Sequence, residues 1–162
     1  MRNGGIGSWP ERRLRISPER DAIWFEGRTT SHAGFAERVR RAAGALAGLG
    51  VGRGDRVAWV SGNHPSALET LFACGQLGAI WVPVNARLSP PEAQYVLEHS
   101  GAAVVVHGRD LGGLADTLRE RVPTVRSWVA AEPPAGGGAG SLPYEDLLAG
   151  AVPEHRDEPV TL

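Results

Sequence analysis

Residues 80–106 read IWVPVNARLSPPEAQYVLEHSGAAVVV and contain a strand, a helix and a second strand in succession. The run Ala102–Val106 is continuously apolar and rich in β-branched valine, as expected for a parallel strand that is buried on both faces. Before it, residues 89–92 (SPPE) form a capping-box pattern with proline at the first helical position, where its missing N–H is harmless. The pattern predicts a helix from Pro90 to Ser100 that ends at Gly101.

The flanking sequence repeats this alternation of short apolar runs and helical periodicity. Upstream, strands are predicted at Arg56–Ser61 and Ile80–Val84, with a helix from about Pro65 to Leu77 between them. Downstream, a helix at Leu111–Arg121 precedes a short strand near Val125–Val129. This order predicts an α/β fold with a mostly parallel, doubly wound sheet of the Rossmann or flavodoxin-like kind, joined by right-handed crossovers.

Two further elements are predicted before this sheet. Residues 22–26 and 28–30 lie on either side of Gly27, which predicts a small hairpin with glycine at its turn. An amphipathic helix is predicted next, because apolar residues recur at spacings of three and four: Phe35, Val39, Ala42, Leu46 and Leu49. Thr30 or Ser31 can cap its start, and Gly50 suits its end.

The composition changes after residue 130. Residues 131–142 include the glycine- and proline-rich run EPPAGGGAGS and are expected to form a loop or linker. Residues 143–162 are expected to hold a short helix near Tyr144–Leu148 and the start of a strand at 158–162. We therefore assign residues 1–130 to an α/β subdomain.

Composition excludes several classes of function. The 162 residues include 17 arginines, no lysine and 18 acidic residues, and this net charge of −1 argues against a nucleic-acid partner. The single cysteine, Cys74, excludes an intramolecular disulfide or a cysteine-based zinc site, and we expect it to be a small core residue. No apolar run is long enough for an integral membrane segment, and the first residues lack a signal-peptide pattern. A cytoplasmic protein is expected.

The residues themselves offer few candidate functional groups and no catalytic set. The five histidines lack metal-ligand spacing, so no metal site is predicted, and His107 is expected at the surface although it follows a parallel strand. Arg87 lies on a loop between a strand and a helix N-terminus, which is a suitable position for binding an anion. A surface arginine without a ligand is an equal alternative.

Several stretches of the chain form an ordered signature. They are residues 30–35 (TSHAGF), 50–58 (GVGRGDRVA), 63–65 (NHP), 72–79 (FACGQLGA) and, most densely, 78–88 (GAIWVPVNARL). This signature resembles the early segment of acyl-CoA synthetases of the adenylate-forming, or AMP-binding, superfamily. The form VNARL at residues 84–88 is more similar to fatty- and aryl-acyl-CoA ligases than to the adenylation domains of peptide synthetases.

The resemblance implies a reaction in two steps. A fatty or aromatic carboxylic acid reacts with ATP and Mg²⁺ to give an acyl-adenylate and pyrophosphate, and the thiol of coenzyme A then displaces AMP. The family's Ser/Thr/Gly-rich phosphate loop and its lysines do not occur in this sequence. We therefore expect no tight cofactor binding by this chain alone. Arg87 matches an arginine that, in some ligases of the family, approaches the nucleotide phosphate of coenzyme A.

Two hypotheses follow. In the first, the chain is the N-terminal portion of an acyl-CoA synthetase, inactive alone, and its partner is the remainder of the synthetase chain. In the second, it is a stand-alone, non-catalytic binding or interaction module on the same scaffold. The end of the sequence in a nascent strand favours the first, since a stand-alone domain is expected to protect its sheet edge. An unfinished edge also suggests a homodimer.

Overall fold

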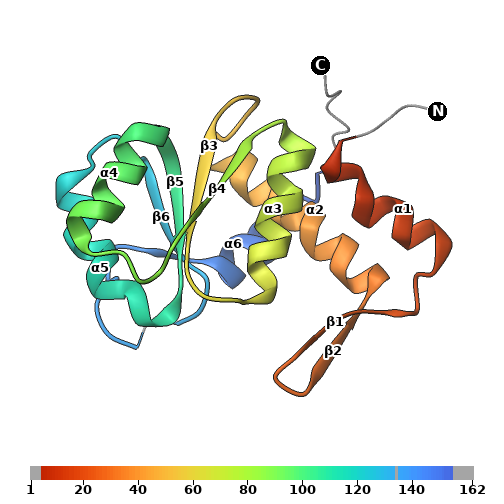
Figure 1. The fold of residues 1–162 in the computed structure, drawn as a ribbon. Coiled ribbons are helices and arrows are strands. Elements are labelled where there is room, and N and C mark those ends of the chain that lie inside the picture. Colours follow the sequence, from red (N-terminus) through yellow and green to blue (C-terminus); the bar gives the residue numbers. More distant parts are fainter. Residues whose placement is uncertain (1–4, 134, 155–162) are drawn as a thin grey trace.

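The computed structural model describes residues 5–133 and 135–154, and it is built on a five-stranded parallel sheet (Figure 1). The strands of this sheet are β3 (Arg56–Val60), β4 (Ile80–Val84), β5 (Ala102–His107), β6 (Ser127–Ala130) and β7 (Leu142–Pro143). The helices are α1 (Trp9–Ile16), α2 (His32–Gly48), α3 (Pro65–Leu77), α4 (Pro90–Ser100), α5 (Gly112–Arg121) and α6 (Tyr144–Gly150), with short 3-10 turns η1 (Ile6–Ser8) and η2 (Arg109–Leu111). Strands β1 (Asp21–Phe25) and β2 (Arg28–Ser31) form a separate antiparallel hairpin.

The strands lie in the order β4-β3-β5-β6-β7, and all neighbouring pairs are parallel. This is the flavodoxin-like order, in which the chain first builds outward to β4 and then returns past β3 to build in the other direction. The prediction of a mostly parallel, doubly wound α/β sheet is therefore confirmed.

Helices cover both faces of the sheet (Figure 1). Alternate residues of β5 divide between the two cores: Val104 and Val106 pack with α2, α3 and α6, whereas Val105 packs with α4 and α5. Every residue of β5 is buried, as the uninterrupted apolar run in this strand predicted.

The predicted helix ends are also confirmed. Ser31 Oγ accepts a hydrogen bond from the amide of Gly34 at 3.2 Å at the start of α2. Ser89 and Glu92 form the expected capping box at the start of α4. Gly101 ends that helix with φ +64°, in the left-handed region that glycine adopts without strain.

Helix α1 was not predicted from the sequence. Four of the eight residues in its segment, WPERRLRI, are charged. The helix is held instead by a distant contact, because Glu11 accepts two hydrogen bonds of 2.7 Å from Arg40 of α2.

The sheet continues past residue 130. Strand β7 pairs with β6, and α6 packs on α2, so the boundary that we placed at residue 130 separates elements of one sheet. The glycine-rich loop between β6 and β7 is joined to α5, where Asp116 Oδ2 accepts a hydrogen bond from the amide of Gly138 at 2.7 Å. The strand that we expected at residues 158–162 lies outside the described residues.

Candidate functional site

The loops that follow β3, β4 and β5 lie at the carboxyl end of the sheet, because parallel strands all end on the same side. In a flavodoxin-like sheet the ligand crevice opens at this end, between the first and third strands in chain order. In this sheet these strands are β3 and β5. The two loops approach closely at that point, because a Cβ atom on Gly108 would overlap the side chain of Ser61. There is therefore no room for a larger side chain at residue 108 beside Ser61.

Arg87 also lies at the carboxyl end of the sheet, on the exposed loop between β4 and α4. Its backbone amide donates a hydrogen bond of 2.9 Å to Asn85 Oδ1, which fixes the turn. The Arg87 side chain is exposed, and in the described part of the chain its guanidinium has no hydrogen-bonding or ionic partner. Helix α4 begins three residues later. The loop position that the sequence predicted for this cation is thus correct.

The first turn of α4 already carries a negative charge. Glu92 Oε2 accepts hydrogen bonds from the hydroxyl of Ser89 at 2.6 Å and from its backbone amide at 2.8 Å. The Ser89 hydroxyl lowers the pKa of the Glu92 carboxyl, so this group is ionised at neutral pH. Among residues 85–89, which form this loop, Arg87 is the one cationic side chain.

A second polar group lies near β5, and it corrects the prediction that His107 is a surface residue. His107 is 1 % exposed. Its Nε2 lies 2.8 Å from the hydroxyl of Ser141, which comes from the loop between β6 and β7, and its Nδ1 lies 3.0 Å from the carbonyl oxygen of Gly108. Burial lowers the pKa of His107. Sequence reasoning missed this pair because Ser141 and His107 are 34 residues apart.

A third polar group joins α2, α3 and α6. Arg38 donates hydrogen bonds to both carboxylate oxygens of Glu69, at 2.6 and 3.1 Å, and to both of Glu145, at 2.6 and 3.0 Å. Glu69 is buried, and it also accepts a hydrogen bond of 3.1 Å from the hydroxyl of Tyr144. Burial and the nearby Glu69 carboxylate raise the pKa of Tyr144 well above its usual value. The phenol therefore stays a hydrogen-bond donor.

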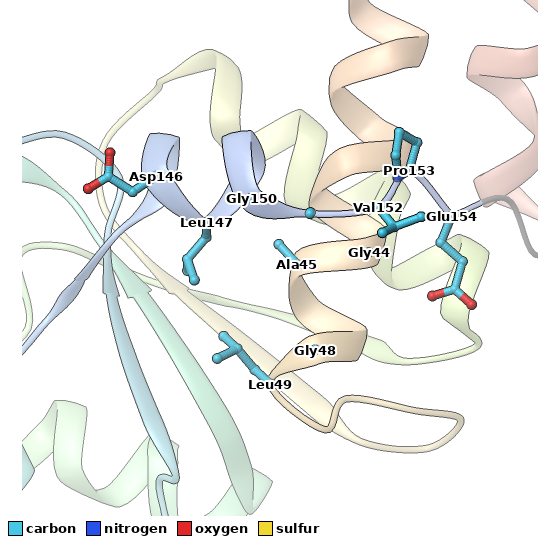
Figure 2. A pocket seen from close by; sticks show the side chains of 11 residues that line it. Gly44, Ala45, Gly48, Leu49, Asp146, Leu147, Gly150, Val152, Pro153 and Glu154 are labelled. Carbon is cyan, nitrogen blue, oxygen red and sulfur yellow. The ribbon is translucent and has the colours of Figure 1, made fainter.

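Two cavities open near α6. The larger, of about 680 Å³, lies between the C-terminal half of α2 and the segment from α6 to residue 154, and Figure 2 shows Ala45, Leu49 and Leu147 at its wall. The smaller, of about 370 Å³, lies at the carboxyl end of β6 and is lined by Ala130, Ala131, Glu132, Pro133, Ser141, Pro143, Tyr144, Glu145 and Asp146. Arg87 lines neither cavity.

Cys74 and His64 have structural roles. Cys74 is buried, and burial raises the pKa of its thiol to about 12, so it is a core residue as expected. His64 caps α3 by accepting a hydrogen bond of 3.3 Å from the amide of Ser66. Within residues 5–133 and 135–154, no three potential metal ligands cluster. In the same residues, no helix combines the length and apolar character needed to cross a membrane.

Comparison with known proteins adds to this geometry. Residues 10–159 match the family model described as "AMP-binding enzyme". A feruloyl-CoA synthase of Amycolatopsis sp is 51% identical over 107 residues, which make up 66% of this chain and 22% of that protein. A long-chain-fatty-acid–CoA ligase of Thermus thermophilus is 39% identical over 119 residues, or 74% of this chain and 22% of that protein.

A solved structure is similar to this chain in its fold. The N-terminal domain of FACL13 from Mycobacterium tuberculosis matches 96% of this chain with a TM-score of 0.84 and 26% identity, and the match covers 38% of that domain's chain. The chain described here thus spans about 22% of the length of the two relatives compared by sequence.

Proposed function

The chain belongs to the AMP-binding enzyme family, and from this premise we propose that it forms the N-terminal part of an acyl-CoA ligase. Such an enzyme joins a carboxylic acid to coenzyme A with consumption of ATP. The match of residues 10–159 to the family model carries this proposal. The similarity to the N-terminal domain of FACL13 supports the assignment to the first part of the enzyme.

The residues near Arg87 fit one phosphate of coenzyme A. The guanidinium is exposed, it has no partner within the described residues, and it precedes the N-terminus of α4. A guanidinium can donate two parallel hydrogen bonds to a phosphate, so this residue would hold and orient the coenzyme. Coenzyme A supplies the thiol that accepts the acyl group.

The residues of this chain do not fit ATP with Mg²⁺. The sequence has no lysine, and the described residues contain no group of carboxylates arranged to hold a metal ion. We therefore derive no step of the adenylation reaction from this chain. We propose that it supplies the scaffold and the Arg87 loop, and that it does not activate the acid when alone.

The acid belongs to the aromatic or the fatty class. The relative with 51% identity is named for feruloyl-CoA, and the relative with 39% identity is named for long-chain fatty acids. Ferulate is therefore the first acid to test.

A chimeric enzyme tests this function. Residues 10–159 replace the corresponding segment of the Amycolatopsis feruloyl-CoA synthase, and formation of feruloyl-CoA is measured with ferulate, ATP, Mg²⁺ and coenzyme A. We expect the chimera to make the thioester. A long-chain fatty acid serves as the control acid. A chimera that unfolds cooperatively on heating but makes no thioester would refute the proposed function.

A further inference from the structure

Ser141 and His107 share a hydrogen bond whose direction the surroundings determine. His107 Nδ1 lies 3.0 Å from the carbonyl oxygen of Gly108, and a carbonyl oxygen can only accept. The hydrogen of the neutral ring therefore resides on Nδ1, and Nε2 carries a lone pair. The Ser141 hydroxyl, 2.8 Å away, donates to that lone pair. This is the relation between a nucleophilic serine and its general base.

A fixed cation stands next to the same oxygen. Arg119 Nη2 donates to Ser141 Oγ at 3.0 Å. Its guanidinium is held by Asp116 at 2.8 Å and lies over the ring of Trp128, 5.5 Å from the ring centre. A preorganised positive group of this kind favours negative charge that develops on the serine oxygen or on an atom bonded to it.

An accessible space adjoins Ser141. Ser141 is half-buried and lines the cavity of about 370 Å³ at the carboxyl end of β6. Alanine and proline side chains and the ring of Tyr144 make up the apolar part of the lining. Glu132, Glu145 and Asp146 also line it, and although Glu145 is paired with Arg38, the charges of Glu132 and Asp146 disfavour an anionic ligand. A small neutral molecule suits this cavity.

We propose that Ser141 is a reactive serine, activated by His107, that accepts the acyl group of small neutral esters. Ser141 Oγ attacks the ester carbonyl carbon as its proton moves to His107 Nε2, and the leaving alcohol takes that proton. Water then attacks the acyl-serine and gives a proton to Nε2, which returns it to Ser141 Oγ as the acid leaves. Neither step needs a cofactor, and the proposal does not depend on the ligase function.

A second serine–histidine contact in the chain provides an internal control. Ser66 Oγ lies 2.5 Å from His64 Nδ1 at the start of α3. Ser66 is 1 % exposed and lines neither cavity, and within residues 5–133 and 135–154 its hydroxyl contacts His64 and no arginine. Proximity to a histidine is thus common to both serines, whereas access and the nearby cation distinguish Ser141.

A neutral fluorophosphonate probe tests the proposal on the 162-residue chain. The serine oxygen displaces fluoride from phosphorus, and mass spectrometry then identifies the labelled residue. We expect labelling at Ser141 and none at Ser66. His107→Gln should slow the labelling by about 100-fold or more, the usual contribution of a general base. The Ser66→Ala variant should be labelled at the rate of the parent chain.

The pH profile supplies a readout that does not depend on a variant's folding. Labelling of the unmodified chain should fall at acid pH as His107 becomes protonated. A folded chain in which Ser141 is labelled no faster than the exposed Ser89 would overturn the proposal. So would a Ser141 labelling rate that does not change on acidification or in a folded His107→Gln variant.

Discussion

The exposed guanidinium of Arg87 leads to a prediction about a single half-reaction. In the chimeric ligase, Arg87→Ala should weaken coenzyme A binding by about tenfold to a hundredfold, because a charge-assisted contact contributes about 1.5–3 kcal/mol. Adenylation of the acid, which does not involve coenzyme A, should keep its rate. Arg87→Lys should restore only part of the affinity, since lysine keeps the charge but loses the paired donors. Calorimetric titration with coenzyme A measures the change.

The matched control for Arg87 is Arg121. It is also exposed, but it is the last residue of α5, at the amino end of the sheet. Arg121→Ala should leave the affinity for coenzyme A unchanged. Equal losses in adenylation and in thioester formation for Arg87→Ala would mean that the residue is structural.

His107 leads to a prediction about pH and stability. Burial lowers its pKa in the folded chain below the usual value of about 6.5, so the unfolded chain binds the proton first as the pH falls. The contribution of neutral His107 is therefore fully present above about pH 6.5 and is lost below it. Urea unfolding between pH 7 and pH 5 should show a decreasing free energy of unfolding. His107→Gln should flatten that slope, and an equal slope in both proteins would contradict this explanation.

Arg87 and His107 also show which site residues a sequence can reveal. The position of Arg87 depends on a strand, a turn and a helix cap that are adjacent in the chain, so the local pattern predicted it. The environment of His107 depends on Ser141, which comes from a loop that follows a later strand. Local patterns contain no information about such a contact, and the expected surface histidine is buried for that reason.

At the scale of elements, Arg38 joins three helices through two carboxylates of very different exposure. The Glu69 side chain is 2% exposed and that of Glu145 is 61% exposed. The hydrogen bonds that the guanidinium donates to Glu145 and Glu69 raise the pKa of Arg38 above its usual value. The ion pair with the buried Glu69 matters more for stability than the ion pair with Glu145, because water screens the exposed pair.

This difference predicts unequal effects of two substitutions. Arg38→Ala should lower the free energy of unfolding by about 3 kcal/mol, because it leaves the buried Glu69 carboxylate without its counterion. Glu145→Ala should cost at most about 1 kcal/mol, as for other exposed ion pairs. Chemical denaturation of both variants measures the difference. Similar losses for the two would show that the Glu69 pair has no special role.

The elements that the sequence failed to predict share a physical cause. Half of the residues of helix α1 are charged, and its Glu11 accepts a hydrogen bond from Arg40 of α2, which lies 29 residues later. Strand β7 has two residues, one of them proline, and it forms only because β6 is already in place beside it. Strands β3 to β6 were predictable because each is a long enough apolar run within an alternating pattern.

In the whole molecule, the doubly wound sheet places Arg87 and the His107–Ser141 pair at its carboxyl end, although these residues are far apart in the sequence. The alternation of strands and helices predicted the doubly wound parallel sheet but left its strand order open, and the cavities at α6 follow from packing that no local pattern encodes. The family match places this scaffold in the first part of an AMP-binding enzyme.

The location of the ATP site is tested by the exchange of labelled pyrophosphate into ATP. Exchange is measured with ferulate for the 162-residue chain and for the chimera side by side. Exchange reports formation of the acyl-adenylate without coenzyme A. The chimera should catalyse ferulate-dependent exchange, and the chain alone should show none above the background without enzyme. Exchange by the pure chain, or none by a folded chimera, would contradict the account that this chain is the scaffold of a ligase whose ATP site lies elsewhere.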